Sequence, residues 1–294
     1  MTEPVELVSR QYKASSLWLD VWRQLRHNPT AVVGFAILIT LTLVAMTAPW
    51  IAPHDPYEMN LREALQPPNS PGHILGSDEL GRDYLSRLIY GSRASLTVGL
   101  IVVGIAGSVG VTLGATSGYY GGIIDSAIMR LVDVLLAFPF LVLAIAVVAV
   151  VGPSLTKMMI VLGGVSWIRY ARLVRGLVLS LREEDYVSAA RVVGVRNWRI
   201  IWRHILPNCL GVVVVQATFD VAAAILAASG LSFLGMGAQP PTAEWGAMLS
   251  TAKAYLRQRP MMSIAPGMAI MITVLAINLV GDALRDALDP RLRV

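Results

Sequence analysis

The run AVVGFAILITLTLVAMTAPWI, residues 31–51, decides the fold class, because it carries no charged side chain over its whole length. A helix of ~20 apolar residues spans the ~30 Å hydrocarbon core of a bilayer. Three further runs have the same character, at residues 94–118, 134–151 and 261–281. A helix satisfies its backbone hydrogen bonds internally, as a bilayer requires. The runs therefore predict membrane-spanning helices.

The composition of the whole chain supports this class. Of the 294 residues, 55% are hydrophobic and 15% are charged, and the mean hydropathy is +0.61, whereas soluble domains carry roughly a quarter charged residues. Two weaker runs lie at residues 155–177 and 210–234, although Lys157 and Arg169 crowd the first and Asp220 interrupts the second. Charges near helix ends can reach the interface at small cost. We therefore expect an all-α integral membrane protein with six transmembrane helices.

The distribution of Lys and Arg predicts the orientation of these six spans. Basic residues are more frequent in both terminal tails and in residues 182–203 than in the two long loops of the opposite side. Basic segments stay in the cytoplasm by the positive-inside rule, so we expect both termini there. The predicted organisation begins with a cytoplasmic tail at 1–29, a first transmembrane helix at 30–52 and an extracytoplasmic loop with an amphipathic helix at 53–93. A core of five further transmembrane helices follows at 94–284 and includes a cytoplasmic loop at 182–207. The chain ends with a cytoplasmic tail at 285–294.

The long loop after the first span changes character along its length. Its first part, with APHDPYEMN and QPPNSPG, is rich in proline and turn residues that prevent a continuing helix. Its second part begins DELGRDYLSRLIYGSRASL, residues 78–96, and has Leu80, Tyr84 and Leu88 at helical spacing. This spacing predicts an amphipathic helix on the membrane or on a neighbouring element, and a solvated connector is the alternative.

Small and polar residues inside the predicted spans indicate contacts between helices. Gly110, Gly114 and Gly118 recur every fourth residue. Such a strip lets another helix approach closely, within this chain or between subunits, although glycine is also common in membrane helices. Asp220 lies near mid-membrane, where an unpaired acid is costly. We expect it either to line a translocation path or to be buried. A buried Asp220 would be hydrogen-bonded to a neighbouring helix or would be neutral.

Motifs for catalysis are missing from the sequence. There is no G-x-x-x-x-G-K-[ST] loop for phosphate, no H-E-x-x-H pair for zinc and no G-x-S-x-G nucleophile elbow. The four histidines, at His27, His54, His73 and His204, show no metal-ligand spacing, and the single cysteine, Cys209, excludes an intramolecular disulfide. We expect no catalytic residue, cofactor or metal site in this chain, so transport, channel or scaffold functions remain.

The segment SAARVVGVRNWRIIWRHILPN, residues 188–208, is basic and lies between two apolar runs. Gly194 provides a turn between two short helices, and Pro207 is expected to end the second one. At about 100° per residue, arginines occupy one side of the second helix and apolar residues the other. The basic side holds Arg196, Arg199 and Arg203, and the apolar side holds Val195, Trp198, Ile201, Trp202 and Ile205.

Three interpretations fit this basic segment: DNA binding, attachment to anionic lipid, and docking on a cytoplasmic partner. DNA binding is disfavoured because both ends are tethered to membrane spans and no third supporting helix has room. Docking is favoured over lipid attachment because the Gly turn and the small pair Ala189 and Ala190 invite close packing.

At these residues the chain resembles the permease subunits of binding-protein-dependent ATP-binding cassette importers. The cytoplasmic loop of that family has Glu-Ala-Ala, a Gly four residues later, and then a hydrophobic residue, any residue, Leu and Pro. Ser188 stands at the Glu position and His204 at the hydrophobic one; the matching residues are Ala189, Ala190, Gly194, Leu206 and Pro207. The resemblance implies that these residues couple the chain to an ATPase, without the salt bridge that a Glu would offer.

Other stretches resemble the second permease subunit of the dipeptide, oligopeptide and nickel branch of that family. They are RHNPTAVVGFAIL, LGSDELGRDYLSRLIYGSRASLTVGL, RLVDVLLAFP, YARLVRG, LSFLGMGAQPP and GDALRDALDPR. These stretches are spread from residue 26 to residue 291, so the resemblance extends over nearly the whole chain. The resemblance implies a type I importer permease fold with cytoplasmic coupling helices, in a bacterial inner membrane.

The same resemblance implies the partners and the cargo. The partners are a second homologous permease subunit, two cytoplasmic ATP-binding subunits and an extracytoplasmic peptide-binding protein, with membrane lipid around the spans and no nucleic acid. The implied cargo is dipeptides or short oligopeptides. Import of nickel or glutathione is the alternative within the family, and an ATPase-independent channel or carrier is the alternative outside it.

Overall fold

The computed structural model describes residues 17–288, and every regular element in that range is helical. The remaining parts of the predicted terminal tails, residues 1–16 and 289–294, lie outside the described residues. The elements are α1 (Leu17–His27), α2 (Pro29–Ile51), η1 (Leu61–Glu63), α3 (Tyr84–Tyr120), α4 (Gly122–Leu136), α5 (Phe140–Val151), α6 (Leu155–Leu181), α7 (Asp185–Val192), α8 (Asn197–Ile200), the π turn η2 (Ile201–Ile205), α9 (Leu206–Phe233), α10 (Trp245–Ala252), η3 (Lys253–Tyr255) and α11 (Met261–Leu288).

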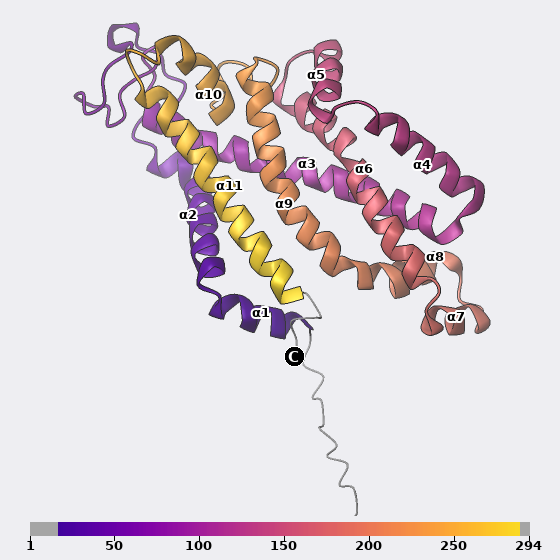
Figure 1. Ribbon diagram of the computed structural model, residues 1–294. Coiled ribbons are helices and arrows are strands. Elements are labelled where there is room, and N and C mark those ends of the chain that lie inside the picture. The colour runs from indigo at the N-terminus through magenta and orange to yellow at the C-terminus, as the bar shows by residue number, and fades with distance from the viewer. Residues whose placement is uncertain (1–16, 289–294) are drawn as a thin grey trace, which may run out of the picture.

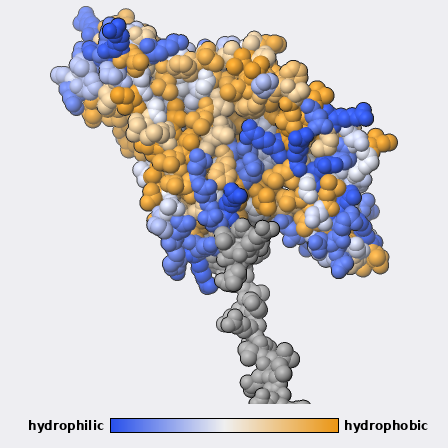
Figure 2. All heavy atoms as spheres, viewed as in Figure 1, coloured by the Kyte–Doolittle hydropathy of each residue, from blue (hydrophilic) through white to orange (hydrophobic). Residues whose placement is uncertain are grey.

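The long helices run between two ends of the molecule (Figure 1). The α10 end carries α10 and the long loop, residues 52–83, whereas the α7 end carries α7 and α8. The first and last described helices, α1 and α11, approach each other at the side of the α7 end (Figure 1). Hydrophilic residues gather at the two ends, and apolar side chains cover much of the surface between them (Figure 2). This distribution is the one expected of a chain that crosses a bilayer.

Four described helices are long and apolar enough to cross a membrane: α2, α3, α11 and the continuous helix Asn197–Phe233, which joins α8 to α9. Helices α4 and α5 meet this standard together, but they are bent by 89° at a short break and would make a fifth crossing only as one span. The span predicted at residues 134–151 is therefore not one unbroken helix. Pro139 lacks an N–H and restricts Phe138, which breaks the helix there.

Helix α6 has the length of a span but is not among these apolar helices. Four cations lie along it: Lys157, Arg169, Arg172 and Arg175. The predicted six spans need α6 as a crossing in addition to the bent pair. Its buried face packs on α3, and the arginines point away to carboxylates on α4 and α9.

Helices α3 and α6 share the most extensive contact of any helix pair in the described chain. A Cβ atom added at Gly110 would lie 2.4 Å from the Trp167 carbonyl oxygen, and one at Gly114 would lie 2.5 Å from the Ala171 carbonyl oxygen. At Gly118 the same atom would lie 2.9 Å from the Arg175 carbonyl oxygen. The glycine strip thus lets two backbones of the same chain touch, which gives van der Waals contact where lipid offers no hydrophobic gain.

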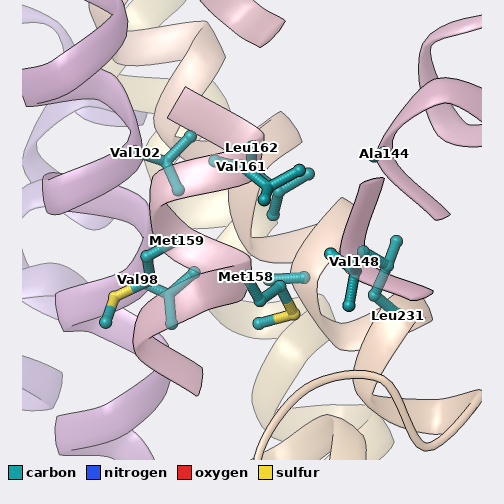
Figure 3. Packing of buried hydrophobic residues seen from close by; sticks show 11 residues of the cluster. Val98, Val102, Ala144, Val148, Met158, Met159, Val161, Leu162 and Leu231 are labelled. Carbon is teal, nitrogen blue, oxygen red and sulfur yellow. The ribbon is translucent and has the colours of Figure 1, made fainter. Parts of the chain in front are cut away.

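One cluster of buried residues joins α3, α5, α6 and α9 (Figure 3). Its members are apolar residues that fill the space between the four helices, among them Val98, Val102, Val148, Met158, Leu162 and Leu231. Each contact between such atoms is small, but a buried side chain makes dozens of them. This cluster fixes α9 against α3 and α6, which positions the polar side chains described below.

The helix predicted from residues 78–96 forms only from Tyr84 onward, and its prediction as a separate amphipathic helix is wrong. Helix α3 begins only at Tyr84 and continues without a break through the second predicted span. The Asp83 carboxylate accepts the Ser86 N–H at 2.7 Å and caps the helix. Before it, Gly81 has φ +73° and lies against the Asn60 carbonyl, a conformation that turns the chain. Arg82 and Arg87, the two arginines nearest the start of this helix, are buried.

Candidate coupling segment and translocation path

The segment between α6 and α9, residues 182–207, folds into two short helices at the α7 end. Helix α7 ends at Val192, and Gly194, which has φ +81°, forms the turn that follows it. The Gly194 N–H donates to the Arg191 carbonyl and the Val195 N–H donates to the Ala190 carbonyl, both at 3.0 Å. These two bonds form a Schellman motif, in which a residue at positive φ follows the helix and satisfies its last carbonyls. The turn therefore depends on glycine at position 194.

One face of the segment is anchored to the helix bundle. Val187 of α7 and Ile200 and Ile205 of the second helix are fully buried, in one cluster with Val174 and Val178 of α6. These contacts hold both short helices against the end of α6. The segment is consequently part of the rigid bundle and not a free loop.

The opposite face of the segment is exposed. Val192 and Val193, beside the turn, are 88% and 81% exposed. Trp198, Trp202, Arg199, Arg203 and Pro207 line a hollow of about 530 Å³. The prediction that both tryptophans share the side of Ile201 and Ile205 is wrong, because the buried isoleucines alone face the bundle. Aromatic rings next to arginines, all open to solvent, are the residue types enriched where proteins bind each other.

The six residues predicted for ATPase coupling divide between the two faces. Ser188, Ala189, Gly194 and Pro207 are exposed. Ala190 is half-buried against the cluster beneath the segment, and Leu206 is buried within that cluster. Only the exposed four could meet a partner directly, whereas Ala190 and Leu206 hold the segment in place.

The prediction that Pro207 ends the second helix is wrong, because the helix continues from Asn197 to Phe233. A π turn, η2, lies just before the proline, and the Leu206 N–H donates to the carbonyl of Ile201, five residues back. Pro207 then falls in the first turn of α9, where a missing N–H does no harm. Such π turns are often associated with functional sites. The second helix of the segment is therefore continuous with the core helix α9.

Asp220 of α9 is buried and paired within the chain. Arg169 of α6 donates to its Oδ1 at 3.0 Å, and Gln216 donates to its Oδ2 at 3.2 Å. The Arg169 guanidinium also lies over the Phe140 ring, 5.5 Å from its centre. The Arg169 side chain is 49% exposed, and both charged residues line a small pocket with Val102, Phe140, Leu162 and Ser166. A cargo amino group would therefore meet a carboxylate that already has a cation beside it.

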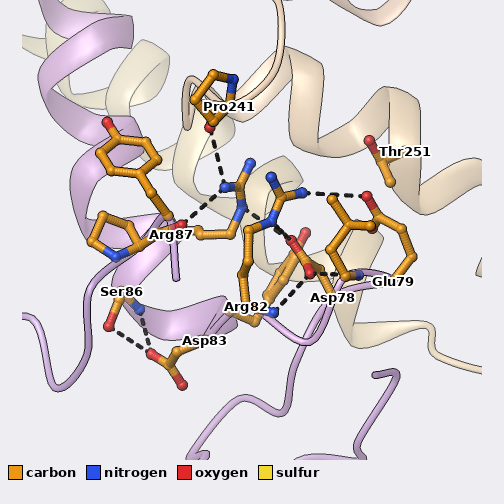
Figure 4. Close-up of polar contacts among 12 residues, drawn as sticks. Asp78, Glu79, Arg82, Asp83, Ser86, Arg87, Pro241 and Thr251 are labelled. Atoms are coloured by element: carbon orange, nitrogen blue, oxygen red, sulfur yellow. Dashed lines mark hydrogen bonds and ion pairs between the residues drawn. The ribbon is translucent and has the colours of Figure 1, made fainter. Parts of the chain in front are cut away.

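Buried charges at the α10 end also join the long loop to the loop before α10 (Figure 4). Asp78 accepts the Arg82 Nε–H at 2.6 Å, and the Arg87 Nε lies 3.3 Å from the same carboxylate. Arg87 also donates to the carbonyls of Pro56 and Pro241, at 3.0 Å and 3.3 Å. Burial raises the pKa of Glu79, and the charge of Asp78 adds to the rise. The network joins the loop after α2 to the loop before α10.

Sequence reasoning missed two arrangements. The first is the ion pair between Asp220 and Arg169. The available signal was that each of two neighbouring predicted spans contains a charged residue, one a cation and the other an anion. The second is a group in the long loop, where His54 and His73 come together with Asp83. No spacing rule predicts this group, because the two histidines are 19 positions apart in the sequence and only the fold of the loop brings them together.

Comparisons with known proteins agree with this geometry. A family model described as binding-protein-dependent transport system inner membrane component matches residues 110–294. A second model, described as N-terminal TM domain of oligopeptide transport permease C, matches residues 16–68.

Similar proteins and structures point the same way. The dipeptide transport system permease protein DppC of Alkalihalophilus pseudofirmus is 45% identical over 96% of this chain and 93% of its own length. The glutathione transport system permease protein GsiD of Pectobacterium atrosepticum is 41% identical over 97% of this chain and 95% of its own. An inward-facing structure of the MetNI methionine ABC transporter matches with a TM-score of 0.50 at 19% identity, over 68% of this chain and 95% of that one.

The structural likeness concerns the fold, whereas the family model covers more than half of the chain and the two relatives cover nearly all of it. This chain therefore belongs to the inner membrane components of binding-protein-dependent transport systems, as a permease subunit of an ATP-binding cassette importer.

Proposed function

We propose that this chain forms half of the translocation path of an importer of dipeptides or short oligopeptides in a bacterial inner membrane. A second homologous permease completes the path, two cytoplasmic ATP-binding subunits drive it, and an extracytoplasmic binding protein delivers the cargo. In this proposal the α7 end and both termini are cytoplasmic. The names of the relatives support a peptide cargo, and the basic residues of the α7 end support the orientation.

The observation that carries the proposed coupling is the two-sided segment of α7 and α8. Its inner face packs on the helix bundle through Val187, Ile200 and Ile205. Its outer face exposes Val192, Val193, Trp198 and Trp202. A docking element needs both properties, since it must bind a partner and also transmit that partner's movement. Packed interfaces switch between arrangements and do not deform continuously.

The continuous helix from Asn197 to Phe233 can transmit movement of the exposed face into the helix bundle. When an ATP-binding subunit shifts the outer face, α8 moves α9 with it, because no break separates them. Helix α9 carries Asp220, which is paired with Arg169 of α6. We propose that this pair borders the path, so that movement of α9 against α6 changes the pocket between them.

Purification by a tag on this chain tests the proposed assembly. We expect a second permease and a nucleotide-binding subunit to co-purify from the native membrane after mild detergent extraction. Substrate flux through this chain reconstituted alone, with no such partners recovered, would contradict the proposal and favour an autonomous channel or carrier.

Glutathione is the second candidate cargo, because the relatives also include glutathione permeases at 41–44% identity. The two cargoes are separated by uptake of labelled dipeptide into vesicles that contain the full complex. We expect excess unlabelled dipeptide to compete and glutathione not to compete. Competition by glutathione alone would assign the chain to glutathione import instead.

A further inference from the structure

The long loop folds two histidines onto the first turn of α3. His54 follows α2, His73 lies in the turn before α3, and Asp83 caps α3. One potential ligand atom from each of the three lies within 4.8 Å of the others. The His73 Nδ1 is 2.8 Å from Asp83 Oδ1, and the His54 Nδ1 is 3.8 Å from the same oxygen. Two imidazoles therefore converge on one carboxylate oxygen.

The surroundings direct this oxygen toward the two histidines. The other carboxylate oxygen of Asp83, Oδ2, accepts both the N–H and the hydroxyl of Ser86, at 2.7 Å each. These bonds fix the carboxylate so that Oδ1 faces the histidines. On the far side of His73, Nε2 lies 3.2 Å from Glu63 Oε2. A carboxylate at that position holds the ring and raises the basicity of Nδ1, as is usual behind a histidine that binds metal.

The distance from His54 argues for a bound ion. At 3.8 Å its Nδ1 is too far from Asp83 for a hydrogen bond, yet its ring lies only 5.2 Å from that of His73. A purely structural role would need only the hydrogen bonds of His73, whereas the position of His54 matches a third ligand. Imidazole nitrogen with carboxylate oxygen is a donor set that zinc prefers, and three protein ligands leave a place for water.

We propose that His54, His73 and Asp83 bind one divalent transition-metal ion of the zinc type, with Glu63 as the residue that positions His73. The ion would join the end of α2, the turn of the long loop and the start of α3 into one unit. This loop lies at the α10 end, away from the coupling segment (Figure 1). The site is therefore separate from the proposed ATPase contact.

The test is zinc titration of the full-length chain in detergent after removal of metal by a chelator. Calorimetry should find one site that is lost in His54→Ala, and cobalt should give the visible absorption of a low-symmetry nitrogen and oxygen site. Glu63→Gln should weaken binding about 10- to 100-fold. The matched control is His204→Ala, at the other end of the molecule, which should bind as the unchanged protein does.

A thermal shift provides a second readout that does not depend on transport. Zinc should raise the melting temperature of the unchanged protein and of His204→Ala, but not that of His54→Ala, because an ion that binds only the folded state stabilises it. His54 has a 42% exposed side chain, so its removal should leave the fold intact. Equal zinc affinity in His54→Ala, or no stoichiometric binding by the unchanged protein, would overturn the proposal and leave His73 as a hydrogen-bonded structural residue.

Discussion

Gly194 is the residue on which the shape of the coupling segment depends most. It has φ +81° and no atom lies within 4 Å of a Cβ built there, so the constraint on this position is backbone conformation and not space. An L-residue in the left-handed region costs about 1–2 kcal/mol, and more when it is β-branched. We expect Gly194→Val to lose uptake and transport-stimulated ATP hydrolysis while membrane insertion is retained.

The matched control for this variant is Gly176→Val on α6. Gly176 also has open space around its Cβ position, but its backbone is helical. Uptake by the assembled complex should therefore fall in the first variant and not in the second. Normal uptake by Gly194→Val would show that the turn has no part in coupling.

Substitutions at Asp220 and Arg169 test whether an ion pair inside the helix bundle stabilises the fold. Asp220→Asn leaves the guanidinium of Arg169 without its charged partner. We expect a loss of about 1–2 kcal/mol, less than the ~3–5 kcal/mol of a fully buried pair, because Arg169 is half-exposed and can be hydrated. Adding Arg169→Gln to the first variant should recover part of the loss, as measured by melting in detergent.

The exposed pair of Arg172 and Asp133 provides the comparison, with side chains 54% and 62% exposed. Arg172→Gln should change stability by less than ~1 kcal/mol. If Asp220→Asn has the same small effect, the charge of Asp220 is not needed for packing. An unchanged melting temperature together with a loss of uptake would favour its proposed place beside the path.

At the scale of elements, the contact between α3 and α6 depends on glycine. Gly114→Ala would place a methyl group 2.5 Å from the Ala171 carbonyl oxygen, so one helix must move. Overpacking of this kind costs about 1–3 kcal/mol, which lowers the melting temperature by several degrees in a chain of this size. Gly104→Ala, on the same helix, has no atom within 4 Å of the new group and should be neutral. Equal melting temperatures would mean that the two helices can separate without cost.

The sequence predicts the existence of helices better than their continuity. Long apolar runs locate α2, α3 and α11 because a bilayer leaves the backbone few alternatives. The same rule cannot place the 89° bend between α4 and α5, nor the π turn that carries the helix through Pro207. In both places proline ruled out a regular helix, but only the packing of neighbouring helices decides whether the chain bends or continues.

At the scale of the whole molecule, the candidate residues divide according to the range of their contacts. Gly194 was predictable, since a lone glycine between two helical patterns has few other roles. The pairing of Asp220 was indicated only by the presence of a cation and an anion in neighbouring predicted spans. Because Arg169 is 51 residues away, no local pattern identified it as the partner. The histidine group was predicted to be absent for the same reason, as the fold of the long loop creates it.

The central claim is that the exposed face of α7 and α8 contacts an ATP-binding subunit. The most direct measurement is thiol cross-linking in the assembled complex, in a Cys209→Ala background that removes the single, buried cysteine. Val192→Cys and Val150→Cys form a matched pair, since both valines are 88% exposed but lie at opposite ends of the molecule. We predict that Val192→Cys cross-links to the ATP-binding subunit and that Val150→Cys does not. Cross-linking at neither position, or only at Val150, would contradict the claim.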